Sequence, residues 1–188
     1  MMIMKKVFSF SLFISLSLCG SLLTAALAQQ AGAEDEITIN LRGVDGKMYD
    51  IASMRGNVLL VSFGATWCVP CADELRILEQ LQKEYEGKPV KFMWVSLEGE
   101  DEVSDKQLKN FAKKLKLTFP VLRDPTKFTF AQFADTVRIP LVTIFNKEGR
   151  LVVRQTGMET PEKYKTAIRQ RIDKFLAASA SANSTGVR

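Results

Sequence analysis

The chain has 188 residues and a formal net charge of +5, from 26 basic and 21 acidic residues. This balance does not indicate a nucleic-acid partner, and three cysteines are too few for a framework of structural disulfides. The length fits one domain with a substantial core and leaves little room for a second.

The first 28 residues predict a secretory signal. Lys5 and Lys6 precede an uncharged, mostly apolar run over 7–28 that ends in small residues. We expect cleavage after residue 28, but the run is close to the roughly 20 residues that span a bilayer, so an uncleaved anchor stays open. We interpret Cys19 as a small apolar residue of the signal, with lipidation as the alternative. In each case the folded part would lie in the periplasm, where disulfides persist.

The expected domain boundaries follow from this signal and from composition. A short linker over 29–36 precedes one folded domain over 37–176. The remaining residues, 177–188, are small and polar and cannot bury much surface, so we expect a disordered tail.

Apolar patterns in the first half predict strands and one long helix. Two short apolar runs around the turn sequence 44–47 indicate a hairpin. Val58–Phe63 and Val90–Leu97 are runs typical of strands buried on both faces. Between them, apolar residues recur at helical spacing from Cys71 to Tyr85. A strand, helix and strand in this order predict a parallel pair.

The second half continues the alternation. Ser104 and Asp105 are candidate caps of a helix with an apolar face reaching Leu115. A short apolar piece over 119–122 and a helix within 128–137 follow. We then expect strands over 142–145 and 150–154, and a closing helix that starts at Thr160 and Pro161. The inward face of this helix comprises Tyr164, Ile168, Ile172 and Phe175.

Cys68 and Cys71 carry the predicted chemistry. Two thiols three positions apart at the start of a helix form a reversible disulfide. The positive end of the helix favours a thiolate at Cys68, which we predict to be the nucleophile. Cys71 would then resolve the mixed disulfide, leaving the protein oxidised and the substrate reduced. Pro70 sets the geometry of the first turn. This chemistry needs no cofactor and no metal ion.

The element order, the motif Trp67–Cys71 at the first strand-to-helix junction and Ile139–Pro140 before a late strand resemble the thioredoxin fold. More narrowly, the chain resembles the TlpA/ResA-type thiol-disulfide oxidoreductases of bacteria, from about residue 37 to 175. The resemblance implies an α/β fold: a thioredoxin-like central mixed β-sheet flanked by helices, with an N-terminal β-hairpin and a helical insertion around 104–117.

The resemblance also assigns roles beside the cysteines. It implies a cis Ile139–Pro140 bond that faces the disulfide and binds substrate as an added strand, against the alternative of an ordinary trans proline. Glu74 would help to move the proton of Cys71, and the alternative is a solvated acid on the first helical turns. Trp67 would shield the disulfide or contact substrate, with partial exposure expected.

Two positions depart from related proteins. Ser62 stands where many thioredoxins carry a buried aspartate, so that proton shuttle cannot be transferred here. Gly64 replaces a frequent tryptophan, which we expect to open space near the site. Val69 between the cysteines and the lack of histidine do not match the strongest oxidants of this fold, which favours a reductant.

The partners implied by the resemblance are cysteine-containing envelope proteins, in cytochrome c maturation or copper-oxidase assembly, and a membrane electron donor of the DsbD or CcdA type. Membrane attachment is expected only if the amino-terminal segment is uncleaved. One alternative function is a thiol peroxidase, suggested by Thr66 two residues before Cys68. Another is a Cu(I)-binding or metal-delivery module that uses both thiolates. We interpret the acidic run Glu98–Glu102 as a solvated surface.

Overall fold

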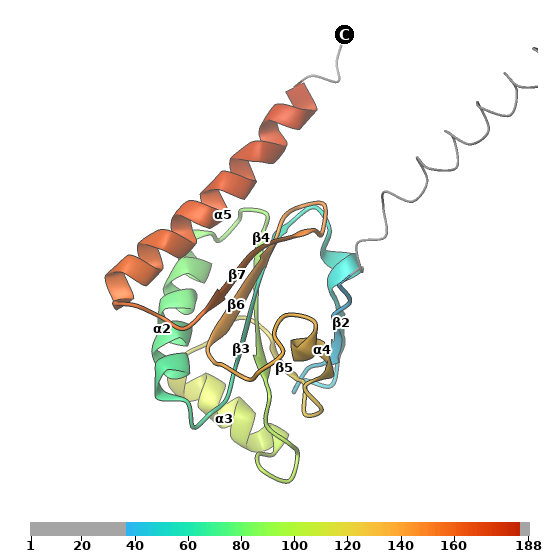
Figure 1. Cartoon of the computed structure of the whole chain (residues 1–188), viewed down its shortest axis with the longest axis vertical. Coiled ribbons are helices and arrows are strands. Elements are labelled where there is room, and N and C mark those ends of the chain that lie inside the picture. Colours follow the sequence, from blue (N-terminus) through green and yellow to red (C-terminus); the bar gives the residue numbers. More distant parts are fainter. Residues whose placement is uncertain (1–36, 185–188) are drawn as a thin grey trace, which may run out of the picture. The chain divides into compact units, whose positions relative to one another are not determined.

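The computed structural model describes residues 37–184 (Figure 1). The expectations for the signal, the anchor, Cys19 and the linker lie outside these residues. Within the described part, no helix has the length and apolar character needed to cross a membrane.

A five-stranded mixed sheet forms the centre of the domain. Its strands stand in the order β5, β4, β3, β6 and β7, where β3 pairs in parallel with β4, β4 in parallel with β5, and the β3–β6 and β6–β7 pairs are antiparallel. The strands are β3 Val58–Gly64, β4 Val90–Ser96, β5 Val121–Arg123, β6 Leu141–Phe145 and β7 Leu151–Thr156. The expected parallel pair is confirmed, and the short apolar piece before residue 123 leads into an edge strand.

Helices cover one face of this sheet. They are α2 Val69–Glu84, α3 Asp105–Leu115 and α5 Pro161–Ser184. Val58 and Leu60 of β3 face this layer and pack with Leu78 of α2 and Ile168 of α5 in one apolar cluster. Alternate side chains of a strand point to opposite faces, so the intervening residues of β3 face the other side.

The opposite face is covered by smaller elements. The hairpin of β1 Asn40–Arg42 and β2 Met48–Asp50 forms its own antiparallel sheet, and it is followed by the short helix η1 Ile51–Met54. One turn of helix, α4 Phe128–Ala131, completes this layer. Leu59, Val61 and Phe63 of β3 pack here against buried rings that include Phe130 and Phe133. Figure 1 shows α4 and β2 on one side of the sheet and α2 on the other.

Two sequence expectations need correction. The helix expected within 128–137 is only one turn long, because a single turn already places Phe130 and Phe133 against Phe63 of the sheet. The disordered tail expected over 177–188 is wrong for residues 177–184, which continue α5. This stretch is rich in alanine, the best helix former, and the chain has no glycine after Pro161 until residue 186.

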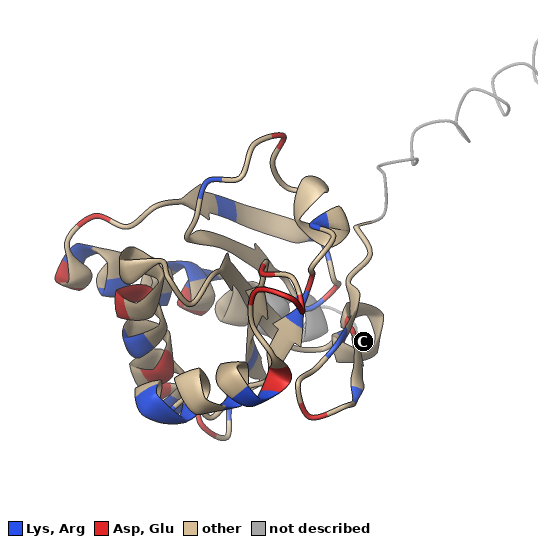
Figure 2. Ribbon diagram, turned by 90° about the horizontal axis from the view of Figure 1, so that it is seen from below, with Lys and Arg blue, Asp and Glu red and all other residues tan. Residues whose placement is uncertain are grey.

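Charged residues of both signs lie on the helices (Figure 2). Glu84 at the end of α2 pairs with Lys165 and Arg169 of α5, each at 2.8 Å. Nearby, the hydroxyl of Tyr85 donates to Asp173 at 2.7 Å. These contacts fix α5 along α2, which matters because α5 also reaches the residues beneath the cysteines.

Candidate active site

A disulfide joins Cys68 and Cys71 at the amino terminus of α2. Cys68 is the N-cap residue, and its sulfur accepts a hydrogen bond from the backbone N–H of Cys71 at 3.2 Å. Pro70 lies in the first helical turn, where its missing N–H costs least. Cys68 is 5% exposed and Cys71 1% exposed. Cys68 is therefore the capping residue and, although buried, the more exposed of the two.

The segment at Ile139 lies beside the disulfide. Its bond to Pro140 is cis, as expected from the resemblance. The side chain of Ile139 packs against Ala65, Cys68 and Cys71 in a small apolar cluster. Pro140 is tied to the far edge of the sheet, because its carbonyl accepts from the N–H of Gly157 at 2.8 Å. Segments more than sixty residues apart in sequence thus meet at the disulfide.

Apolar side chains remain exposed around this position. Trp67, immediately before Cys68, is 71% exposed, which confirms the expected exposure. Val69 is equally open, and Val137, two residues before Ile139, is half exposed. Exposed apolar side chains next to a reactive group are typical of a contact region for another molecule.

Glu74 lies one helical turn beyond Cys71 and is almost completely buried. The hydroxyl of Ser62 in β3 donates to its Oε2 and the hydroxyl of Tyr164 in α5 donates to its Oε1, both at 2.5 Å. A solvated surface acid is therefore excluded. Ser62 does not replace the buried acid seen in many thioredoxins; it holds a carboxylate that comes from the helix instead of the strand.

Burial raises the pKa of Glu74 to about 7, and the hydrogen bonds from Ser62 and Tyr164 partly oppose this by favouring the charged form. Burial, together with the contact to Glu74, raises the pKa of Tyr164, which stays protonated and continues to donate. Glu74 is thus a carboxyl that exchanges a proton near neutral pH.

Gly64 ends β3 directly beneath the disulfide. A Cβ at this position would lie 3.2 Å from Cys71 Sγ and 3.0 Å from Nε1 of Trp94 in β4. The expectation of open space is therefore wrong, because the indole of Trp94 reaches this point from the neighbouring strand. Two side chains thus approach this glycine closely enough that a Cβ would be tightly packed.

A second buried carboxylate, which the sequence reasoning missed, holds the loop before Cys68. Glu98 accepts hydrogen bonds from the backbone N–H of Thr66 at 2.8 Å and from its hydroxyl at 2.6 Å. The hydroxyl of Ser96 also donates to it, at 3.0 Å. Because Thr66 donates its hydroxyl hydrogen to Glu98, it does not donate to Cys68 as the peroxidase alternative requires.

The interpretation of Glu98 as a solvated acid is thus wrong. Its position in the sequence, directly after a buried strand, could have indicated its role. Glu98 follows β4 as Thr66 follows β3. Parallel strands end at the same edge of a sheet, so an acid after one strand faces the loop after the other.

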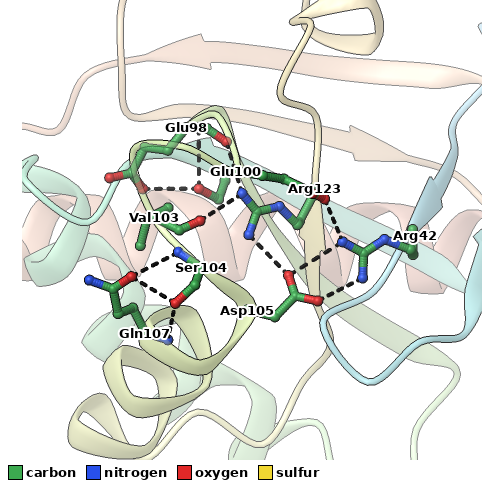
Figure 3. Close-up of polar contacts among 9 residues, drawn as sticks. Arg42, Glu98, Glu100, Val103, Ser104, Asp105, Gln107 and Arg123 are labelled. Atoms are coloured by element: carbon green, nitrogen blue, oxygen red, sulfur yellow. Dashed lines mark hydrogen bonds and ion pairs between the residues drawn. The ribbon is translucent and has the colours of Figure 1, made fainter.

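An arginine network supports the turn that carries Glu98 (Figure 3). Arg123 of β5 donates to the carbonyls of Glu98 and Val103, at 3.3 and 2.8 Å, and pairs with Asp105 at 3.0 Å. Asp105 also pairs with Arg42 of β1 at 2.7 Å. The helical insertion and the hairpin are thereby joined to the loop behind the active site.

The start of α3 is fixed separately. Ser104 caps the helix, and its side chain and that of Gln107 form a reciprocal capping box. Of the two candidate caps, Asp105 is therefore left free to bind the two arginines. Among residues 37–184, no group of three or more histidine, cysteine or acidic side chains is arranged to hold a metal ion.

Comparison with known proteins agrees with this geometry. The chain matches the Redoxin family over residues 30–168. It is 24% identical over 161 residues to the thiol-disulfide oxidoreductase ResA of Bacillus thuringiensis, covering 82% of this chain and 90% of that protein. It is 36% identical over 85 residues to the thioredoxin-like protein YneN of Bacillus subtilis, covering 45% of this chain and 49% of that protein.

Solved structures give the same answer for the fold. The pneumococcal exposed lipoprotein thioredoxin Etrx1 of Streptococcus pneumoniae matches with a TM-score of 0.59 and 29% identity, covering 73% of this chain and 98% of that chain. The expected thioredoxin-like fold and the resemblance to ResA-type proteins are therefore confirmed.

Proposed function

Because the chain belongs to the Redoxin family and carries a disulfide at a helix amino terminus, we propose that this thiol-disulfide oxidoreductase reduces disulfides of other proteins in the periplasm. The observation that carries the proposal is the asymmetric placement of the two sulfurs. Cys68 caps the helix and is the more accessible, whereas Cys71 lies against the sheet over Gly64.

The reaction runs in two exchanges. The thiolate of Cys68 attacks one sulfur of a substrate disulfide, so that a mixed disulfide forms and the other substrate sulfur leaves as a thiolate. Cys71 then loses its proton and attacks the Cys68 sulfur. The S–S bond between Cys68 and Cys71 forms, and the second substrate sulfur leaves. The substrate gains two electrons and the protein loses two.

Glu74 acts on the proton of Cys71 in this proposal. Cys71 and Glu74 are three positions apart on one face of α2, and they stand over Gly64 and Ser62, which are two positions apart on one face of β3. A carboxyl with a pKa of about 7 accepts a proton from the thiol and returns it in the reverse direction without a large penalty.

The substrate would bind across the exposed apolar surface around Cys68. Trp67 would cover one side of the mixed disulfide, and the chain at Ile139 and Pro140 would pair with an extended substrate segment. Cysteine-containing envelope proteins, including those of cytochrome c maturation or copper-oxidase assembly, fit this chemistry. A membrane protein of the DsbD or CcdA type would restore the dithiol.

The test is the reduction potential of residues 29–188, measured by equilibration with a thiol buffer and trapping of free thiols. A reductant is expected near the roughly −270 mV of thioredoxin or the −200 to −230 mV of glutaredoxins. A value near about −120 mV would make the protein an oxidant and contradict the proposed direction.

Variants test the two cysteines separately. Cys71→Ser is expected to accumulate mixed disulfides with substrate proteins, whereas Cys68→Ser is expected to form none and to lose insulin reduction. Persistent insulin reduction by Cys68→Ser would refute its role as nucleophile.

A further inference from the structure

The indole of Trp94 is an unexplained polar group in the core. Its side chain is 0% exposed, and its Nε1–H finds no hydrogen-bond acceptor among the described residues. An unpaired buried donor costs about 1–3 kcal/mol, so a native structure rarely keeps one without a reason. An apolar ring such as phenylalanine at this position would fill much of the same space without burying an unpaired donor.

The position of this N–H links it to the disulfide. The point at which a Cβ of Gly64 would stand is 3.0 Å from Trp94 Nε1 and 3.2 Å from Cys71 Sγ. The two atoms thus flank the space that a side chain at residue 64 would fill. Trp94 is the register partner of Ser62 on β4, and the Trp94 ring packs against Phe111 of α3, with centroids 5.3 Å apart. Packing on this side holds the ring in place.

Other acceptors near Trp94 are already engaged. The carbonyl of Gly64 accepts from the N–H of Leu97 at 3.0 Å, and both carboxylate oxygens of Glu74 accept from hydroxyls. The sulfur of Cys71 lies across the Gly64 position from the indole. In the disulfide this sulfur is a weak, neutral acceptor; as a thiolate it is charged and accepts strongly.

From this geometry we propose that Trp94 Nε1–H donates a hydrogen bond to the Cys71 sulfur in the reduced protein. The inference rests on the proposed function, in which Cys71 passes through the thiolate. Reduction by a dithiol breaks the Cys68–Cys71 bond, adds two electrons and gives each sulfur a proton or a negative charge. The Cys71 sulfur then becomes the acceptor that the indole lacks in the oxidised protein, so the contact stabilises the reduced state.

The surroundings of Cys71 contain few competing charges. The titratable groups near it are Cys68 and Glu74 of its own helical turns, Tyr164 of α5, which bonds Glu74, and Glu98 after β4, which bonds Thr66. Strands β3 and β6 contain no titratable residue, and Lys91 of β4 is exposed at the opposite end of the strand. The effect of losing the indole N–H on the titration of the Cys71 thiol can therefore be measured with few other titrating groups nearby.

The direct test follows the indole N–H by NMR in protein labelled with ¹⁵N-tryptophan. The chain has two tryptophans, and Trp67→Phe assigns the two signals. On reduction with dithiothreitol, the Trp94 indole proton is expected to move downfield, and further as Cys71 is deprotonated. Cys71→Ala, which removes the acceptor, is expected to abolish this movement. An indole signal that is unchanged by reduction would overturn the inference.

A second test uses the thiol–disulfide equilibrium. Trp94→Phe is expected to make reduction by glutathione about tenfold less favourable, equivalent to about 30 mV for a two-electron couple, and to raise the pKa of the Cys71 thiol. Phe92→Leu is the matched control, because Phe92 is a buried ring of the same cluster on the same strand and has no donor. Equal shifts in the two variants would assign the effect to packing and refute the hydrogen bond.

The two proposals fail separately. A protein that reduces no protein disulfide but shows the Trp94 signal moving with the Cys71 redox state would refute the proposed function and retain the hydrogen bond. A protein that reduces protein disulfides but whose Trp94 signal does not move on reduction would retain the proposed function and refute the hydrogen bond.

Discussion

The buried carboxyl of Glu74 makes the stability of the protein depend on pH in an unusual direction. A carboxyl bound by salt bridges stabilises a fold in its charged form, but burial favours the neutral form of Glu74. Glu74→Gln replaces it with a neutral group of the same shape. The amide oxygen accepts from one of the hydroxyls of Ser62 and Tyr164, and the amide nitrogen donates to the other. The variant therefore removes the charge and keeps both contacts.

The magnitude follows from the pKa. A carboxyl with an ordinary pKa of 4.5 in the unfolded chain and about 7 in the fold binds more protons when folded. Its stabilising contribution is fully present below about pH 4.5 and is lost as the pH rises through 7. Because one pKa unit is about 1.4 kcal/mol, the full loss is about 3 kcal/mol. Glu74→Gln should exceed the stability of the wild type by only about 1 kcal/mol or less near pH 5 and by up to the full amount above pH 8.

The assay is urea unfolding of the oxidised protein at intervals from pH 5 to pH 8.5. Carboxyls whose pKa is lowered, such as those of Glu84 and Asp105, change charge below this window and leave the comparison clear. Asp73→Asn is the control, because Asp73 lies on the same helix next to Glu74 but is exposed. Its curve should run parallel to that of the wild type. If the Glu74→Gln curve is also parallel, the raised pKa is refuted.

Three further substitutions give defined outcomes. Gly64→Ala would place a methyl group 3.2 Å from Cys71 Sγ and should cost about 1–3 kcal/mol in chemical unfolding; no loss would contradict the close packing. Glu98→Ala removes the acceptor of the Thr66 backbone N–H and should lower stability by about 1–3 kcal/mol; an unchanged thermal midpoint would show that this contact contributes nothing. Tyr164→Phe removes a donor to the charged form of Glu74 and should raise the carboxyl pKa above about 7, moving the pH dependence of unfolding upward.

Much of the fold could be predicted because its elements have strong local patterns. The continuous apolar run of β3, the helical spacing from Cys71 to Tyr85 and the helix-start residues Ser104 and Pro161 each specify one element without help from the rest of the chain. The edge strand β5 was harder to identify, since it has three residues and little room for a pattern. The end of α5 was missed because a small, alanine-rich sequence forms a helix by intrinsic propensity without an apolar face.

The residues of the site also differ in whether the sequence alone identifies them. Cys68 and Cys71 are local in sequence, and their spacing alone suggests a disulfide. The partners of Glu74 are not local, because Tyr164 lies 90 positions away and was predicted only as part of an apolar helical face. Its hydroxyl needed a buried partner, but the sequence does not say which one. The indole N–H of Trp94, in an apolar strand, also needs a buried partner that the sequence does not identify.

The two buried carboxylates of the site differ in what their partners allow. Glu98 binds both the backbone N–H and the hydroxyl of Thr66, so it ties the main chain of the loop before Cys68 to the end of β4. Glu74 is held by hydroxyls alone, and a hydroxyl both donates and accepts. Glu74 can therefore gain a proton and keep both contacts, since the hydroxyl of Ser62 or Tyr164 turns to accept it. This difference suits Glu98 to fixing the loop before Cys68 and Glu74 to moving a proton.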